Sequence, residues 1–565
     1  MHRMLRVYRL EGFRQPFHIL AIAVCLFAAM ATLQAQEPAA KDTSAPNADV
    51  AGYVGNEPCG ACHAGIYASF MRTAMAHASG PANENLIAGE FTHKPSGVHY
   101  SVYRESGKVW LSFSRPDDLD DKREFLYFIG QGRRGRTYLF SVDDFVFESP
   151  VNWYADRQIW DMAPTYGNDK EIPLNLPATT SCLHCHVSGV RPPLNGSDNL
   201  YPSPIFNYSG VTCERCHGPG AAHANGGAIV NPAKLSPKLR DQVCMQCHLE
   251  GNAAIERAGR HIYDYKPGSD LSEFARYFIL TGNVPPGLRA TSQFEGLAQS
   301  ACKKKSGDAM TCTSCHDPHK SVEPEDRVTF YRTKCLACHG GGVFSFKHHP
   351  KQPDCAGCHM PQILSTDVAH TEVTDHRILR APAAAPADSR SAALPELTPF
   401  PYDVPADPRT LALAWQSIVS SGMTAAQPKA EQLLREALKS SPNDPALLSA
   451  LGYIAQKKGD SDQARALYQK ALQADSTLVD AAANLGVLEA QQGHVAEAIK
   501  LWQSAFERAP GRSEIGMNLA RVYCGTRQFD AARDSVLRVL RFNPDLAAAK
   551  KLITGLTASP AECAL

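Results

Sequence analysis

The pattern of hydrophobic and polar positions divides the chain of 565 residues into segments of different character. Between about 90 and 160, β-branched and aromatic residues form short, partly alternating runs, as in Val98–Arg104, Val109–Phe113 and Phe125–Ile129. Turn residues such as Ser106-Gly107 separate these runs. Alternation with a period of two is typical of strands that bury one face. The segment therefore predicts a small antiparallel β-module.

A different period begins near 411 and continues to about 544. Small residues recur every 34 positions, and a large residue follows four positions after each alanine of the series. The two series are Gly452, Gly486 and Ala520, and Ala430, Ala464, Ala498 and Ala532, with Leu434, Tyr468, Trp502 and Val536 as the large residues. This pattern resembles the tetratricopeptide repeat, a pair of helices in about 34 residues. We predict four units and a final helix over 409–558.

Such repeats stack into an α-solenoid with a concave surface that holds a peptide or a partner protein. We expect a partner protein to dock there, and the alternative is an appendage that only stabilises the rest of the chain. Before the repeats, 381–408 is rich in Ala and Pro and predicts a semi-extended linker. Under the docking hypothesis, deletion of 409–565 is expected to remove partner binding and leave the absorption spectrum of the remaining chain unchanged.

The N-terminus combines arginines with an apolar run from Ile19 to Leu33 and small residues near Ala35. This layout predicts a secretory signal peptide over 1–35, followed by a polar linker over 36–51. The apolar run is short for a membrane span, so an uncleaved anchor is the alternative and the only membrane contact expected. The predicted localisation is periplasmic or otherwise exported.

Seven C-x-x-C-H motifs lie between 52 and 380. Two thiols and an adjacent imidazole at this spacing form the attachment site of c-type haem. Zinc ribbons and disulfide frameworks also use paired cysteines, but neither requires histidine after every pair. We therefore predict seven covalent c-type haems, attached at Cys59, Cys62, Cys182, Cys185, Cys213, Cys216, Cys244, Cys247, Cys312, Cys315, Cys335, Cys338, Cys355 and Cys358. The motifs are numbered 1 to 7 in chain order.

Each haem iron has two axial positions, and the motif histidines supply one of them. These proximal ligands are His63, His186, His217, His248, His316, His339 and His359. A second histidine on the iron would give a low-spin carrier, whereas an open position would admit substrate. The distal candidates are His77, His93, His223, His319, His348, His349, His370 and His376, with Met75 as a competitor of His77. His99, in a predicted strand, and His184, inside a motif, rank lower, and the sequence leaves His261 undecided.

Composition adds two points to this picture. The 57 basic and 57 acidic side chains balance, and haem propionates would make the holoprotein acidic, so nucleic acid is not an expected partner. Arg133–Arg136 and Lys303–Lys305 are candidates to neutralise propionates, or they are solvated basic patches. Outside the motifs, Cys524 and Cys563 are close enough in sequence to pair in an oxidising compartment. Cys302 is a buried thiol or an axial thiolate.

Three stretches resemble motifs of the nitrite reductase and hydroxylamine oxidoreductase superfamily of multihaem cytochromes. They are Cys213-Glu-Arg-Cys-His-Gly-Pro-Gly-Ala-Ala-His223, Cys312-Thr-Ser-Cys-His-Asp-Pro-His319 and His348 through His376. The resemblance implies distal roles for His223 and His319, for His348 or His349, and for His370 or His376. The chain lacks the C-x-x-C-K motif of the pentahaem nitrite reductases and the eighth haem and cross-linked tyrosine of the hydroxylamine oxidoreductases.

The predicted fold is mainly α. A haem-packed cytochrome c domain over 52–380, with short helices after each motif, long loops and the β-module at about 90–160, precedes the solenoid. The β-module either covers the first haem or presents a surface to a substrate or partner. The predicted function is electron transfer through seven haems. The alternatives are an oxidoreductase of a small nitrogen or sulfur compound at one open haem, with unknown catalytic residues, and a filament-forming conduit.

Overall fold

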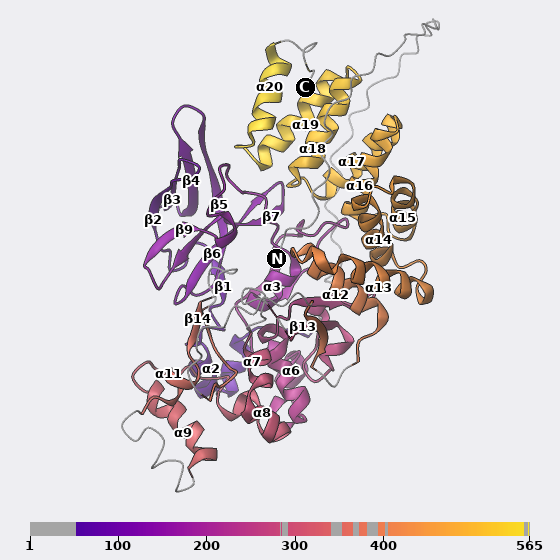
Figure 1. Ribbon diagram of the computed structural model, residues 1–565. Coiled ribbons are helices and arrows are strands. Elements are labelled where there is room, and N and C mark those ends of the chain that lie inside the picture. Colours follow the sequence, from indigo (N-terminus) through magenta and orange to yellow (C-terminus); the bar gives the residue numbers. More distant parts are fainter. Residues whose placement is uncertain are drawn as a thin grey trace, which may run out of the picture.

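The structure is a computed structural model that describes residues 52–282, 284, 292–340, 353–364, 372–380, 394–401, 405–558 and 563 (Figure 1). The predicted signal peptide and the linker over 36–51 lie outside the described residues, as do the distal candidates His348, His349 and His370. Among the helices that are described, none is long and apolar enough to cross a membrane.

The predicted β-module is a nine-stranded antiparallel sheet. Its central path runs β2-β3-β4-β5-β6-β8-β9, with β1 beside β5 and β7 beside β6. In β3 and β4 alternate residues are buried, and Tyr100 pairs with Phe113 across the two strands. The strands are β1 (Ser79–Pro81), β2 (Gly89–His93), β3 (Val98–Glu105), β4 (Lys108–Arg115), β5 (Leu119–Ile129), β6 (Gly135–Val142), β7 (Phe145–Glu148), β8 (Val151–Tyr154) and β9 (Ile159–Met162).

Most of the haem motifs lie within short helices. Further short helices, at 64–70 and 221–224, follow motifs 1 and 3, so the prediction of a helix after the motif is confirmed for these two and wrong for motif 2, which is followed by a strand. A helical turn brings the two cysteines, three residues apart, onto one side of the backbone. The motif helices are α1 (Glu57–Cys62), α3 (Thr180–His186), α4 (Glu214–His217), α6 (Pro237–His248), η8 (Cys312–Ser314), α9 (Arg327–His339) and α11 (Cys355–His359). Between them lie α2 (Ala64–Phe70), α5 (Ala221–Ala224), α7 (Gln293–Gln299) and α8 (Ala301–Ser306).

Three small sheets connect parts of this region. They are β10 (Val187–Val190) with β11 (Phe206–Ser209), β12 (Ala253–Glu256) with β13 (Ala275–Thr281) and β16 (Glu396–Phe400), and β14 (Gln362–Leu364) with β15 (Glu372–Thr374). β16 lies inside the segment predicted to be a linker, where it pairs with β13 in register Ile279 to Thr398. The linker prediction missed this strand because its hydrogen-bond partner is more than a hundred residues away in sequence.

The repeat prediction is confirmed by four helix pairs and a final helix. The small residues of the 34-residue series let paired helices approach: a Cβ on Gly486 would lie 2.6 Å from Nε1 of the buried Trp502, and one on Gly452 2.9 Å from Tyr468. The helices are α12 (Pro408–Ser420), α13 (Gln427–Ser440), α14 (Pro445–Lys457), α15 (Ser461–Ala474), α16 (Val479–Gln491), α17 (Val495–Arg508), α18 (Ser513–Gly525), α19 (Phe529–Phe542) and α20 (Ala547–Ala558).

The solenoid contacts the rest of the molecule at both ends (Figure 1). At its beginning, Trp415 of α12 shares a buried cluster with Phe278 and Leu397 of the β12-β13-β16 sheet. At its end, Phe542 of α19 packs against the rings of Phe145 and Phe147 in the β-module, with centres 6.0 and 5.9 Å away. The repeats therefore span from the haem-motif region to the β-module.

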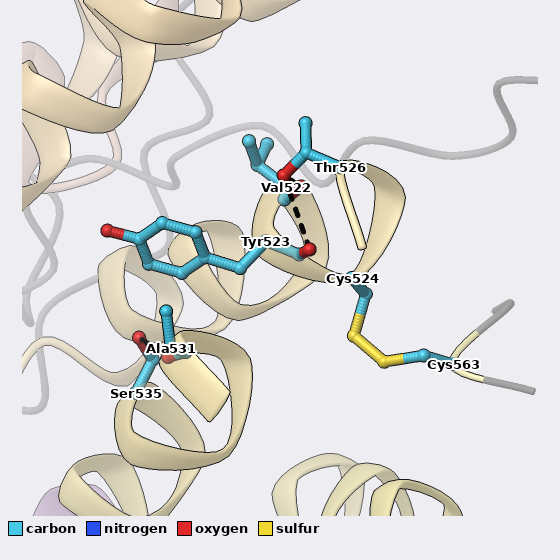
Figure 2. The surroundings of a disulfide bond; sticks show 7 residues. All are labelled: Val522, Tyr523, Cys524, Thr526, Ala531, Ser535 and Cys563. Atoms are coloured by element: carbon cyan, nitrogen blue, oxygen red, sulfur yellow. Dashed lines mark hydrogen bonds between the residues drawn. A yellow bond between two sulfur atoms is a disulfide. The ribbon is translucent and has the colours of Figure 1, made fainter. Parts of the chain in front are cut away.

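Ionic contacts also hold the end of the solenoid against the β-module. Asp545, only 1% exposed, binds Arg115 of β4 at 2.6 Å and Lys550 of α20 at 3.1 Å, and it also accepts the Ile172 N–H at 3.2 Å. Cys524 on α18 and Cys563 beyond α20 form the predicted disulfide (Figure 2). This bond ties the end of the chain to the last complete repeat.

Candidate functional site: one cavity shared by the haem motifs

A single cavity of about 3120 Å³ runs through the region below the β-module. Its wall includes both cysteines and the histidine of every one of the seven C-x-x-C-H motifs. Motifs spread over some three hundred residues of sequence therefore open into one continuous space. No group of three or more His, Cys, Asp or Glu side chains within the described ranges is arranged to hold a metal ion.

Three motif histidines each face a histidine from another part of the chain. The ring centres of His63 and His223 are 6.3 Å apart, those of His217 and His319 are 6.1 Å apart, and those of His316 and His376 are 6.3 Å apart. Metal–imidazole bonds are about 2 Å long and a ring nitrogen lies roughly 1 Å from the ring centre, so imidazoles sharing one iron have centres about 6 Å apart. The three pairs fit an iron between the rings.

Hydrogen bonds and burial favour the tautomer and the neutral form in which these imidazole rings bind iron. Nδ1 of His217, His223 and His376 contacts the backbone carbonyl of Val230, Gly227 and Thr374 at 2.9, 3.0 and 2.7 Å, which selects Nε2 as the metal-binding nitrogen. Burial also lowers the pKa of His217, His316 and His376. The neutral imidazole, which is the form that binds metal, is thereby favoured near neutral pH.

Contacts between cysteines of different motifs give the order of the motifs in space. Cys59 lies close to Cys213, and Cys335 lies close to Cys355. Motif 4 has the most neighbours: Cys247 lies close to Cys185 of motif 2, Cys244 lies close to Cys312 of motif 5, and Cys216 of motif 3 lies close to both motif 4 thiols. Electrostatic contacts of Cys315 with Cys338 and of Cys335 with Cys315 connect motifs 5 and 6. The motifs thus form three branches that meet at motif 4.

Buried carboxylates hold neighbouring motifs together, and sequence reasoning missed them. Glu214, inside motif 3 and 1% exposed, accepts the N–H groups of Val54 and Gly55 at 2.9 Å and of Gly220 at 2.8 Å. Asp241, on α6 before motif 4, accepts the Cys312 N–H of motif 5 at 2.9 Å. A glutamate within a C-x-x-C-H motif has no sequence signal that separates this role from a solvent-exposed one.

The other distal candidates lie elsewhere. His93 is buried at the end of β2, where its ring contacts Ser96 Oγ at 2.9 Å and the Gly167 carbonyl at 3.1 Å. His77 contacts the Met71 carbonyl at 2.6 Å beside a separate small hollow, whereas Met75 lines the shared cavity. The structure thus brings Met75, and neither His77 nor His93, to the haem motifs.

The structure also shows where His99, His184, His261 and Cys302 lie. His184 is buried under the Arg215 guanidinium, which contacts both ring nitrogens, and burial and this cation lower its pKa. His99 lies on β3 and His261 contacts Glu256 at 2.9 Å. Cys302 is a half-buried free thiol on α8 at the cavity wall, close to Cys315 and Cys335.

The basic side chains singled out in the sequence have two roles: some bind other parts of the protein, and others line the cavity. Arg136 donates to three backbone carbonyls and thus supports the loop between β5 and β6. Lys305 lines the cavity, whereas Lys303 binds Asp241 at 3.2 Å. Further basic side chains on the wall, suited to haem propionates, are Lys234, Arg240, Arg327, Arg332, Lys334 and Arg380.

Comparisons with known proteins agree with the two parts of this architecture. The family model for cytochrome c554 and c-prime matches 162–218, and the model for a doubled CXXCH motif matches 305–343. Two tetratricopeptide repeat models match 428–479 and 489–556.

Two curated relatives are multihaem cytochromes. Multiheme cytochrome MtrA of Shewanella baltica is 25% identical over 181 residues, which cover 28% of this chain and 52% of the relative. C-type polyheme cytochrome OmcC of Geobacter sulfurreducens is 29% identical over 168 residues, which cover 29% of this chain and 20% of the relative. The matched region thus spans about half of one relative and a fifth of the other. Among solved structures, MamA matches 28% of this chain and 84% of its own at 20% identity, with a TM-score of 0.25.

The motifs, the cavity and these matches together define the class. The chain combines C-x-x-C-H motifs of the kind that bind haem c in multihaem c-type cytochromes, which it resembles, with C-terminal tetratricopeptide repeats. The comparisons do not confirm the narrower placement among the nitrite reductases and hydroxylamine oxidoreductases.

Proposed function

We propose that the chain is an exported electron carrier with seven covalent haems. The observation that carries this proposal is the single cavity, whose wall includes the thiols and histidine of all seven motifs. Bound haem c supplies a one-electron redox couple at each iron. The chain attaches the haems, supplies their axial histidines and, through motif contacts, sets a branched route with motif 4 as its junction.

Within this proposal, the haems of motifs 1, 3 and 5 are six-coordinate. His63 and His223 hold the haem of motif 1, and His217 and His319 hold the haem of motif 3. His316 and His376 hold the haem of motif 5. The assignment rests on the 6.1–6.3 Å spacing of the ring centres. Each distal histidine follows a motif other than the one whose iron it would bind, so loading one haem orders the segment after another motif.

The test begins with purified, oxidised holoprotein. We expect a pyridine haemochrome assay to give seven haems per chain, and electron paramagnetic resonance to show low-spin bis-histidine signals. The variant His223→Ala is expected to convert one low-spin haem to high spin, whereas His99→Ala, on a strand of the β-module, leaves the spectrum unchanged. Fewer than seven haems, or an unchanged spectrum for His223→Ala, would contradict the assignment.

Export to the periplasm or another oxidising compartment is the second part of the proposal. It is supported by the N-terminal signal pattern and by the Cys524–Cys563 disulfide, since disulfides persist in oxidising compartments. N-terminal sequencing of the mature protein is expected to begin at Gln36. A mature chain that begins at Met1 contradicts cleavage and leaves the uncleaved anchor.

Docking of a redox partner on the repeats is the third part. Tetratricopeptide repeats commonly bind other proteins, and Leu537 on α19 is an apolar side chain of the array that is 49% exposed. We expect Leu537→Glu to slow reduction by a protein donor without changing reduction by a small dye. Equal slowing by both reductants would place the effect on the haems, and no slowing would exclude this face as the dock.

A further inference from the structure

Motif 2 ends one branch of the motif network, beside the β-module. Its Cys185 lies close to Cys247 of motif 4, and Cys182, one helical turn earlier, lies next to the β-module. There the thiol contacts the Thr179 hydroxyl at 3.6 Å and lies next to the carboxylate of Glu148 on β7. The cavity at this end is therefore enclosed by α3 on one side and by the β-module on the other.

The β-module contributes polar side chains, beside the apolar Ile129 and Leu139, to the wall at this end of the cavity. Thr137 and Leu139 of β6, Glu148 of β7 and Asn152 of β8 all line it. Tyr166, at the end of a short 3₁₀ helix (Pro164–Tyr166), lines it as well. A module that served only to cover a haem would be expected to present mainly apolar side chains, because polar groups lose hydration on burial.

Two polar atoms of this wall are buried and have no hydrogen-bond partner. Thr137 is 4% exposed and Asn152 is 5% exposed, and neither Thr137 Oγ1 nor Asn152 Oδ1 is hydrogen-bonded. The amide of Asn152 is oriented by a hydrogen bond to the Tyr154 hydroxyl, which partly offsets the effect of burial in raising the Tyr154 pKa to about 12. Buried polar atoms in native proteins are nearly always satisfied, so a partner from outside the chain is indicated.

The chemistry of the wall selects that partner. Asn152 Oδ1 can only accept hydrogen bonds, and the Glu148 and Asp169 carboxylates lie close enough to Tyr166 to raise its pKa together with burial. Acceptors and negative charge favour a ligand with N–H or O–H donors. The same carboxylates repel anions, which argues against a haem propionate as the partner of Thr137 and Asn152.

We propose that the cavity between the β-module and motif 2 is a binding site for a small ligand that carries N–H or O–H donors and no negative charge. Thr137 and Asn152 receive its hydrogen bonds, and Glu148 and Asp169 favour a cationic form. This function is additional to electron transfer, because the ligand would bind beside motif 2, at the end of one branch of the motif network.

The experiment uses the oxidised holoprotein and two probes of equal size and opposite charge. Methylammonium carries three N–H donors, and acetate carries none. The proton relaxation of each methyl group is measured by nuclear magnetic resonance, because a probe bound near a ferric haem relaxes faster. The variants are Thr137→Val and Asn152→Leu, alone and combined. The matched control is Tyr100→Phe, which removes a buried, unpartnered hydroxyl of the same module away from the cavity.

We expect enhanced relaxation for methylammonium and much less for acetate. Each single variant should weaken methylammonium binding about fivefold, the value of one hydrogen bond, and Tyr100→Phe should leave it unchanged. Equal enhancement of both probes, or native binding by the double variant, overturns the proposal. If the double variant loads fewer haems, the comparison rests on Thr137→Val, which keeps the volume of the side chain.

Discussion

At the scale of single residues, Glu214 shows how a side chain inside a haem motif can fix a distant part of the chain. Its two carboxylate oxygens accept three backbone N–H groups, two of which lie about 160 residues earlier, just before motif 1. Removal of the carboxylate would leave these buried donors without an acceptor. We therefore expect Glu214 to govern how motifs 1 and 3 come together.

The prediction is that Glu214→Ala lowers the free energy of unfolding by about 3 kcal/mol, since hydrogen bonds to charged groups contribute about 1.5–3 kcal/mol each. Haem loading at motif 1 should fall as well. Thermal unfolding of the holoprotein and a haemochrome count measure the two effects. Glu57→Ala, which removes an exposed carboxylate two residues before Cys59, is the control and should change neither. Equal effects of the two variants would show that the buried contacts of Glu214 do not matter.

The distal histidines show what can be predicted at this scale. Short motifs around His223, His319 and His376 carry a resemblance, and among the described candidates these three face motif histidines. His77 and His93 have only their place in the haem region in their favour, and both rings contact backbone carbonyls instead. Counting residues of a useful type does not reveal which of them the fold brings to the cavity.

At the scale of elements, the 34-residue period depends on glycines that let helices touch. A Cβ on Gly486 would meet the Trp502 indole ring, which is fully buried and donates its N–H to the Ala483 carbonyl at 2.9 Å. We expect Gly486→Ala to destabilise the array by about 1–3 kcal/mol, as overpacking does. Gly555→Ala on α20, with nothing within 4 Å of its added Cβ, should instead stabilise by about 0.5–1 kcal/mol. Thermal denaturation compares them, and the same sign for both would contradict the packing argument.

The disulfide gives a second prediction for the elements. It closes a loop of 39 residues that contains α19 and α20. Cys524→Ser with Cys563→Ser is expected to lower the free energy of unfolding by about 3–4 kcal/mol. Hydrogen exchange should rise in α19 and α20 and remain unchanged in α12 to α14. Cys302→Ser, which removes a free thiol on α8, is the control, and no difference between the two variants would contradict a structural role for the bond.

The helices and strands also differ in how well they can be predicted from the sequence. Helices of the array and strands of the β-module bury one face with a regular period, so their existence follows from the pattern. β16 does not: it is a short strand next to an Ala- and Pro-rich stretch, and only its pairing with β13 and its contact with α12 make it one. Strands of this kind depend on tertiary context and escape local reasoning.

At the scale of the whole molecule, the repeats connect two distant parts of the structure rather than extend from one. α12 covers the β12-β13-β16 sheet, and α19 covers Phe145 and Phe147 of the β-module. Deletion of 409–565 would expose both apolar surfaces. The expectation that such a deletion leaves the absorption spectrum of the remaining chain unchanged is therefore not supported, and point changes at one junction are the sharper test of what the repeats do.

Asp545 is the residue for that test. It is buried and binds Arg115 across the junction and Lys550 within the array, so Asp545→Ala leaves the two cations with only the half-exposed Asp118 as a shared carboxylate. We expect a loss of about 3 kcal/mol and faster hydrogen exchange in β4, β5 and α20, with α12 to α14 unchanged. Asp530→Ala removes a carboxylate that is 94% exposed and paired only with Arg533 on the same helix, and it should have little effect. If exchange rises equally at both ends of the solenoid, the array moves as one rigid body; if it rises nowhere, the junction is held by its aromatic contacts alone and its ion pairs are dispensable.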